Sequence, residues 1–150
     1  VRSQPYIIVM GDFNDYPTDK SLKRLCSGNG LQNLMKGKKG GTYRYRGEWG
    51  IFDQFLVSSN MLTKNKIAFA KRKMAKAKNK IVKANHEYTG AYLENVQILR
   101  HPFLLEEDEK YGGDKPFRTF NGLKYNGGYS DHLPIALDLL IRDDKDYYLK

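Results

Sequence analysis

The chain has 150 residues, with 40% hydrophobic and 13% aromatic residues. This composition is typical of a globular domain that is large enough to bury a core. No run of the sequence approaches the ~18 apolar residues that a membrane span needs, which excludes a transmembrane segment within these residues. The single Cys26 excludes an internal disulfide.

The formal net charge of +9 comes from one segment of the chain. Residues 64–83 carry nine basic residues and no acidic one, whereas the remaining residues carry 17 of each sign. One interpretation is an electrostatic arm for nucleic acid or another acidic surface. The other is a solvated basic insertion, over residues 64–85, between two strands. Aromatic residues for base stacking are limited to Phe69 and Tyr88, so we favour the insertion.

The alternation of apolar runs and turn residues predicts an α/β (α+β) class. The apolar sequence YIIVM predicts a first strand over residues 5–10. A helix is predicted over residues 19–27, capped by Thr18 or Asp19 and ended by a Gly-Asn-Gly sequence. Further strands are predicted over residues 42–45, 51–58, 95–99 and 133–141.

Two polar sequences lie at the ends of predicted strands. Asp12 and Asn14 belong to GDFN directly after the first strand, and Asp131 and His132 belong to SDHLP at the start of the last one. Strand ends present side chains to a ligand crevice. Two carboxylates, an amide and an imidazole are the groups that metal-assisted attack on a phosphate ester needs. Each sequence alone is also compatible with a turn or a helix cap, but their joint occurrence favours a site.

A third acidic residue, Asp53, lies inside the strand-like sequence IFDQFLVS. Aspartate is depleted in strands, and its burial without a partner is costly. A buried carboxylate beside an imidazole fixes the orientation and the tautomer of the ring. The alternatives are a solvated strand face, or an ion pair with Arg44 or Arg46.

These three sequences, in this order, resemble the second half of the endonuclease/exonuclease/phosphatase superfamily. Its members share the fold of pancreatic deoxyribonuclease, abasic-site endonucleases, neutral sphingomyelinases and inositol-polyphosphate 5-phosphatases. The resemblance covers most of the chain, including the sequence TYRYRGEW before the Asp53 strand. It implies half of a four-layer α/β/β/α sandwich, with one mixed, largely antiparallel sheet and flanking helices.

The resemblance also implies a role for each of five residues. Asp12 would orient or deprotonate the attacking water, and Asn14 would hydrogen-bond the scissile phosphate. Asp131 would help to bind a divalent cation. His132 would contact the phosphate and assist its protonation, with Asp53 as its orienting partner.

A cofactor and substrate contacts follow from the same resemblance and from the neighbouring loops. The implied cofactor is Mg²⁺ or Mn²⁺. Arg46 is a candidate phosphate contact, and Trp49 and Arg118 are candidates for the rim of the crevice, because loops at sheet ends carry specificity. The implied substrate is a phosphate ester, with nucleic acid as one class of partner.

The chain departs from the family pattern in its extent. Family members carry another half before this one, which supplies a metal-binding Glu, an Asn and a second His. This chain begins directly before a strand and has no initiator Met. We therefore expect residues 1–150 to be the C-terminal half of a domain, with the missing half as a partner. An isolated half should bind Mg²⁺ weakly, hydrolyse poorly and self-associate through its exposed sheet face.

Two hypotheses from different classes remain. The first is a divalent-metal-dependent hydrolase of phosphate esters (phosphodiesterase, nuclease or phosphatase), present here as an incomplete fragment. The second is a catalytically silent fragment that acts as a basic module for nucleic acid or acidic surfaces. A longer parent chain that supplies a Glu and a His to the same crevice would distinguish the first from the second.

Overall fold

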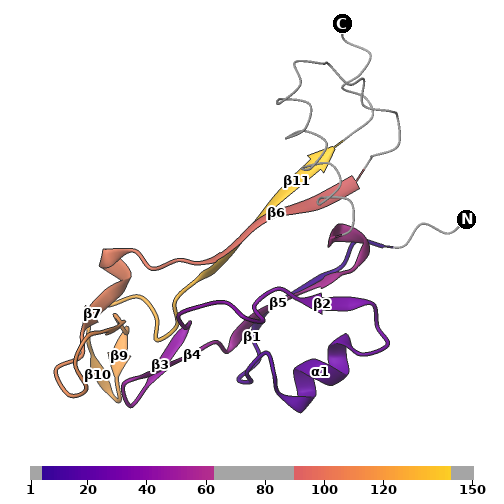
Figure 1. Ribbon diagram of the computed structural model, residues 1–150. Coiled ribbons are helices and arrows are strands. Elements are labelled where there is room, and N and C mark those ends of the chain that lie inside the picture. Colours follow the sequence, from indigo (N-terminus) through magenta and orange to yellow (C-terminus); the bar gives the residue numbers. More distant parts are fainter. Residues whose placement is uncertain (1–4, 63–89, 143–150) are drawn as a thin grey trace, which may run out of the picture.

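The computed structural model describes residues 5–62 and 90–142 (Figure 1). This part of the chain is mostly strand, and every pair of strands in it is antiparallel. Its elements are β1 (Ile8–Asp12), α1 (Lys20–Cys26), β2 (Leu31–Asn33), β3 (Tyr43–Tyr45), β4 (Glu48–Gly50), β5 (Asp53–Ser58), β6 (Gly90–Ile98), the 3-10 helix η1 (Pro102–Leu104), β7 (Leu105–Glu107), β8 (Asp114–Pro116), β9 (Phe120–Asn121), β10 (Lys124–Tyr125) and β11 (Ile135–Arg142).

A three-stranded sheet, in the order β1-β5-β2, places the first two candidate sequences side by side. Its central strand β5 is buried along nearly its whole length, because side chains on both of its faces are covered. Leu56 and Val57, which point to opposite faces, are both fully buried. The register sets Asp12 directly opposite Asp53 at one end of the sheet.

The β6–β11 ribbon packs on this sheet through one apolar face. Val96, Ile98, Ile135 and Leu137 pack against a core formed by three buried residues, Met35, Ile51 and Phe55. The alternate residues Asn95, Gln97 and Asp138 are exposed, as the period of two requires. A register shift between Asp138 and Leu139 interrupts the ladder. The ribbon therefore ties the last candidate sequence, which precedes β11, to the face of β5 that carries Phe55.

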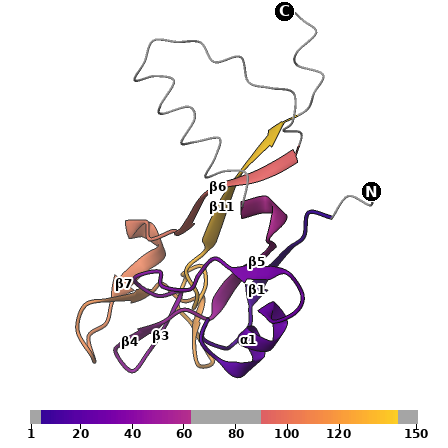
Figure 2. The same ribbon diagram turned by 45° about the vertical axis from the view of Figure 1, so that its right-hand side comes forward.

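Three hairpins gather at the lower end of the β6–β11 ribbon, to the left of α1 and the three-stranded sheet in Figures 1 and 2. They are β3–β4, β7–β8 and β9–β10. The buried side chain of Arg44 in β3 links two of them, because it donates to the carbonyl oxygens of Gly112 and Asp114 and lies 3.8 Å from Asp108.

The strands at 5–10, 42–45, 51–58, 95–99 and 133–141 and the helix at 19–27 were predicted, and each has a counterpart within a few residues. The prediction that these strands form a single sheet was wrong, since the described strands form five small sheets. The β6–β11 ribbon joins the core by packing rather than by hydrogen bonding to β1 or β5. The basic insertion predicted over residues 64–85 lies wholly outside the described residues.

Strand β1 is exposed although its sequence is apolar. Met10 is 69% exposed, and Ile7, Ile8 and Val9 are also exposed. Among the described strands β1 pairs only with β5, so its other edge carries backbone groups without a strand partner. An all-apolar run is typical of a strand that is covered on both faces, whereas here it forms an edge.

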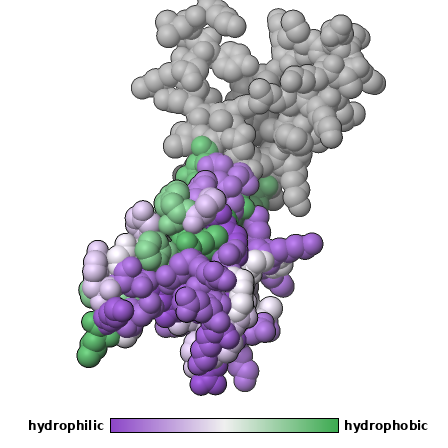
Figure 3. Space-filling view, turned by 90° about the vertical axis from the view of Figure 1, so that its left-hand side faces the viewer, coloured by the Kyte–Doolittle hydropathy of each residue, from purple (hydrophilic) through white to green (hydrophobic). Residues whose placement is uncertain are grey.

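The face seen in Figure 3 is largely hydrophilic, with hydrophobic side chains gathered in the upper half of the described part. No helix among residues 5–62 and 90–142 is long and apolar enough to cross a membrane.

Candidate active site

The end of β1 fixes Asp12 through local backbone geometry. Gly11 has φ +138°, a conformation that only glycine adopts readily, and Asn14 has φ +53°, which asparagine tolerates. The backbone N–H of Asn14 donates to Asp12 Oδ1 at 2.8 Å. One carboxylate oxygen is thereby held by the turn, and the other, Oδ2, points to the end of the sheet.

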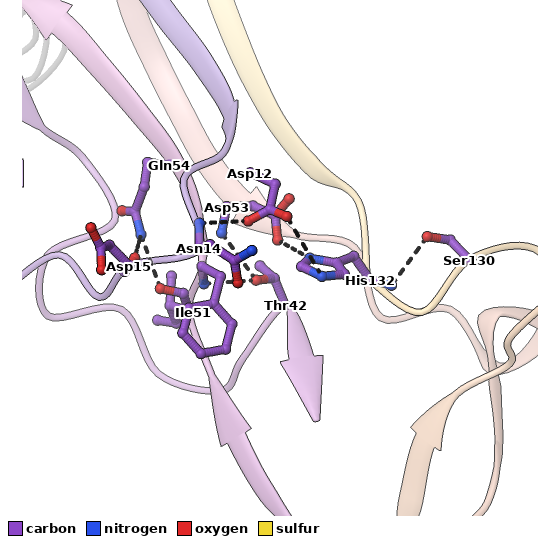
Figure 4. A network of polar contacts seen from close by, with 10 residues as sticks. Asp12, Asn14, Asp15, Thr42, Ile51, Asp53, Gln54, Ser130 and His132 are labelled. Atoms are coloured by element: carbon purple, nitrogen blue, oxygen red, sulfur yellow. Dashed lines mark hydrogen bonds and ion pairs between the residues drawn. The ribbon is translucent and has the colours of Figure 1, made fainter. Parts of the chain in front are cut away.

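His132 lies between two carboxylates (Figure 4). Its Nδ1 is 2.7 Å from Asp53 Oδ2, which is a direct hydrogen bond. Its Nε2 is 3.9 Å from Asp12 Oδ2, too far for a direct hydrogen bond. The backbone N–H of His132 donates to Ser130 Oγ at 3.1 Å, which holds the turn before β11. The Asp53–His132 contact predicted from the sequence is present.

Because Nδ1 of His132 is hydrogen-bonded to a carboxylate, Nε2 is the nitrogen available to a reactant. In a neutral imidazole, Nδ1–H donates to Asp53 and Nε2 keeps a free lone pair. Nε2 then faces Asp12 across a gap that is wide enough for an oxygen atom of a reactant to contact both groups. The arrangement suits proton transfer to or from an oxygen atom placed in that gap.

A cavity of about 600 Å³ opens at this end of the sheet. That volume is within the usual range for small-molecule sites. Its lining combines acidic and polar side chains with aromatic ones. The lining residues are Asp12, Asn14, Asp131 and His132, together with Tyr16, Tyr43, Tyr45, Arg46, Glu48, Gly50 and Phe52. Four residues with predicted catalytic or metal-binding roles thus line it, and Asp53 contacts it through His132.

Arg46 lies at the tip of the β3–β4 hairpin on the rim of the cavity. It has φ +50°, and Gly47 after it has φ +87°, the pattern of a two-residue type I′ turn. Arginine is unfavourable in this conformation, which asparagine or glycine would normally occupy. A strained residue on a cavity rim is a feature of functional sites. Arg46 lines the cavity, and its role as a phosphate contact stays a prediction.

Trp49 and Arg118 lie away from this cavity. Trp49 lines a smaller cavity of about 250 Å³, and its ring is 4.5 Å from the Arg100 guanidinium carbon. Arg118 lies 5.3 Å over the ring of Tyr43 and donates to the Arg44 carbonyl at 3.3 Å. Their predicted substrate contacts therefore gain no support from the lining of the site.

The structure decides between the alternatives for Asp53. Arg44 approaches Asp108 and the 112–114 carbonyls rather than Asp53, and Arg46 lies at the hairpin tip. Asp53 is partly buried and is satisfied by His132. Tyr16, Tyr45, Phe52 and Glu48 line the cavity but were not predicted as site residues. For Tyr45 and Glu48 the alternation along β3 and β4 is a signal that could have found them, because it directs every second side chain of that hairpin to one face.

The carboxylate oxygens of the site are the type of ligand that a hard divalent cation prefers. Asp12, Asp53 and His132 each offer an atom within 4.8 Å of the others. Asp53 Oδ2 and His132 Nδ1 are engaged with each other, so Asp12 and the cavity-lining Asp131 are the carboxylates free to hold an ion. Carboxylate oxygens suit Mg²⁺ or Mn²⁺ that retains several waters, and weak binding of such an ion by this chain stays a prediction.

Residues 2–140 match the sequence model of the Endonuclease/Exonuclease/phosphatase family. Because this match covers most of the chain, the protein belongs to that family, whose members are hydrolases that generally use divalent metals. No curated protein and no solved structure is significantly similar to it.

Proposed function

We propose that this chain carries part of the active site of a divalent-metal-dependent hydrolase of phosphate esters. The observation that carries the proposal is the position of His132, hydrogen-bonded to Asp53 through Nδ1 and facing Asp12 through Nε2. Family membership supports hydrolase activity in general. A phosphodiesterase, a nuclease and a phosphatase are all compatible with the cavity.

Each role follows from the atom that a side chain presents. Asp53 orients His132 through Nδ1, so Nε2 contacts the phosphoryl group and assists its protonation. Asp12 Oδ2 orients or deprotonates the attacking water. Asn14 donates to the phosphate, and Asp131 helps to hold Mg²⁺ or Mn²⁺. When bound, the ion supplies positive charge that polarises the phosphoryl oxygens.

We further propose that residues 1–150 form the C-terminal half of a four-layer α/β/β/α sandwich. The support is β1, an apolar strand that is exposed and unpaired on one edge among the described residues. A second half that pairs with this edge would cover Met10 and its neighbours and complete the ion's ligands. In its absence the same surface favours self-association.

The test measures hydrolysis of bis(p-nitrophenyl) phosphate, p-nitrophenyl phosphate and single- and double-stranded DNA. Two forms are compared, the 150-residue chain and any longer polypeptide that its reading frame encodes. Asp12→Asn and His132→Gln should each lower the rate by about 10²-fold or more, since general acid–base groups contribute 10²–10⁴-fold. Chelation of divalent ions should abolish the rate, and added Mg²⁺ or Mn²⁺ should restore it.

The matched control is Asp138→Asn, which removes an exposed carboxylate on β11 outside the cavity and should leave the rate unchanged. A loss of less than about tenfold, or about 1.4 kcal/mol, in either site variant would make that residue peripheral. Robust hydrolysis by the chain alone would refute the half-domain proposal but not the hydrolase. No hydrolysis by either form, together with salt-sensitive DNA binding, would favour the basic module instead.

A further inference from the structure

The Asp53–His132 pair is held by residues that come from β3 and the residue before it. Asp53 starts β5 and His132 precedes β11, so the two side chains come from segments that are 79 residues apart in sequence. The hydrogen bond between them is short only if both segments are fixed to a common support. The contacts of Thr42 and Tyr43 show where that support lies.

Thr42 is 0% exposed and binds the backbone on both sides of the pair. Its Oγ1 accepts from the N–H groups of Phe52 and Asp53, at 3.1 and 3.3 Å. Its carbonyl oxygen accepts from the N–H of Leu133 at 2.6 Å. Both lone pairs of the hydroxyl oxygen are therefore used on the Asp53 side, and the carbonyl is used on the His132 side.

Tyr43 covers the imidazole of His132 itself. The two ring centroids are 4.8 Å apart, and the rings are inclined by 37°. The same two residues also form an isolated antiparallel bridge. Rotation of a histidine ring about χ2 meets only a broad, weak preference, so a contact of this kind is what restrains it. Tyr43 thus keeps Nδ1 towards Asp53.

Arg118 and Phe52 hold Tyr43 in turn. The Arg118 guanidinium carbon is 5.3 Å from the centroid of the Tyr43 ring, and Phe52 meets that ring at 5.7 Å in an edge geometry. A cation over an aromatic face is attracted by the negative face of the ring. The position of Arg118, outside the cavity lining, is explained by this contact rather than by a substrate contact.

We propose that Thr42 and Tyr43, with Arg118 behind Tyr43, are positioning residues that fix the tautomer and orientation of His132. This proposal gains its catalytic meaning from the proposed hydrolase function, but its direct consequence is a property of the histidine. Whenever its ring is neutral, His132 should be the Nδ1–H tautomer in the folded chain, because Nδ1 is the nitrogen hydrogen-bonded to Asp53. An unrestrained histidine in water favours the Nε2–H tautomer instead.

The test is ¹⁵N NMR of the full 150-residue chain labelled at histidine, with the His132 signals assigned by His132→Gln. The wild type should show a protonated Nδ1 and a bare Nε2 at a pH where the ring is neutral. Tyr43→Leu and Thr42→Val should both move the Nδ1 and Nε2 shifts towards the averaged values of a free ring. Tyr43→Phe and Thr42→Ser should restore the wild-type pattern.

The control is Tyr125→Leu, which removes an exposed tyrosine from β10, where it contacts Phe120. Its spectrum should match the wild type. Circular dichroism identifies any variant that fails to fold, and Thr42→Val, which keeps the side-chain volume, provides the decisive reading if Tyr43→Leu unfolds. A wild-type tautomer in folded Tyr43→Leu and Thr42→Val would overturn the proposal.

Tyr43→Leu and Thr42→Val should also lower kcat, measured in the form of the protein that hydrolyses phosphate esters. The expected loss is about tenfold or more, which is the effect of removing a residue that supports a site residue. Thr42→Val should leave KM unchanged, because Thr42 does not line the cavity. Altered tautomers in a protein that hydrolyses no phosphate ester would refute the hydrolase and leave the positioning inference intact.

Discussion

Gln54 is a buried amide that satisfies three partners at once. It is 0% exposed, and its Nε2 donates to the carbonyl oxygens of Asp15 and Ile51, each at 2.9 Å. Its Oε1 accepts from Asn33 Nδ2 at 3.1 Å. These hydrogen bonds join the loop after Asp12 to the segment before Asp53, so the Gln54 side chain connects the two segments that carry these acidic residues.

Gln54→Leu should destabilise the chain by about 1–3 kcal/mol, because buried polar groups lose their partners. The free energy of unfolding in urea measures the effect. Gln97→Leu, which changes an exposed glutamine on β6 in the same way, should stay within about 0.5 kcal/mol of the wild type. Equal losses in the two variants would show that the amide bonds contribute nothing.

Which single residues meet at the site could largely be foreseen. Asp12 and His132 stand at the ends of apolar runs, and Asp53 is an acid that no isolated strand would favour, so each is conspicuous locally. Trp49 and Arg118 were chosen by proximity in sequence, which does not determine on which side of a hairpin a side chain lies. Only the tertiary contacts with Arg100 and Tyr43 reveal that.

Among the elements, the β3–β4 hairpin is the one with strain at its tip. Arg46→Asn places a residue that tolerates the left-handed conformation at φ +50°. We expect it to raise the free energy of unfolding by up to ~1 kcal/mol and to raise KM for phosphate esters. Urea unfolding and steady-state kinetics test the two parts.

Lys124→Asn on β10 removes one exposed cation outside the cavity lining, and it should change neither quantity. If KM for Arg46→Asn stays at the wild-type value, Arg46 does not contact substrate. A fall in stability would instead mean that the stacking of Arg46 over Tyr45, at 5.1 Å, outweighs the backbone strain.

The elements themselves were easier to predict than their partners. Apolar runs and turn residues located β1, α1, β5 and β11 because those signals are local. The grouping of strands into sheets depends on contacts between distant segments, which alternation does not specify. The β6–β11 ribbon pairs internally because its two strands match in apolar faces and in length, and it therefore meets β5 face to face.

At the scale of the whole molecule, we predict that the exposed β1 edge pairs with another copy of the isolated chain. Met10→Lys should suppress concentration-dependent self-association, because a lysine on an edge strand opposes strand addition. Sedimentation velocity over a range of protein concentrations measures it. Leu25→Lys on α1 is the control, since Leu25 is also exposed but belongs to a helix.

Association that survives in Met10→Lys and disappears in Leu25→Lys would place the contact on α1. A wild-type chain that stays monomeric at every concentration would remove the support that β1 gives to a missing half.

The facing positions of Asp12 and Asp53 affect how readily the end of the β1–β5 ladder opens. They are the last paired residues of the β1–β5 ladder, and like charges directly opposite each other weaken such a pair by roughly 0.2–1 kcal/mol. The ladder should therefore fray from this end. A cation held by Asp12 and Asp131 would offset the charge of Asp12 and weaken this repulsion, so ion binding should protect the backbone at this end of the ladder from exchange.

The rate of amide hydrogen exchange measures this protection directly. The Phe13 N–H donates to the Phe52 carbonyl at 3.0 Å just beyond the facing acids. Its exchange should slow when Mn²⁺ is added, but not with K⁺ at equal ionic strength. Asp53→Asn removes one of the two charges and should slow exchange without any divalent ion. The carboxylates of the site would then also control how often this end of the sheet opens.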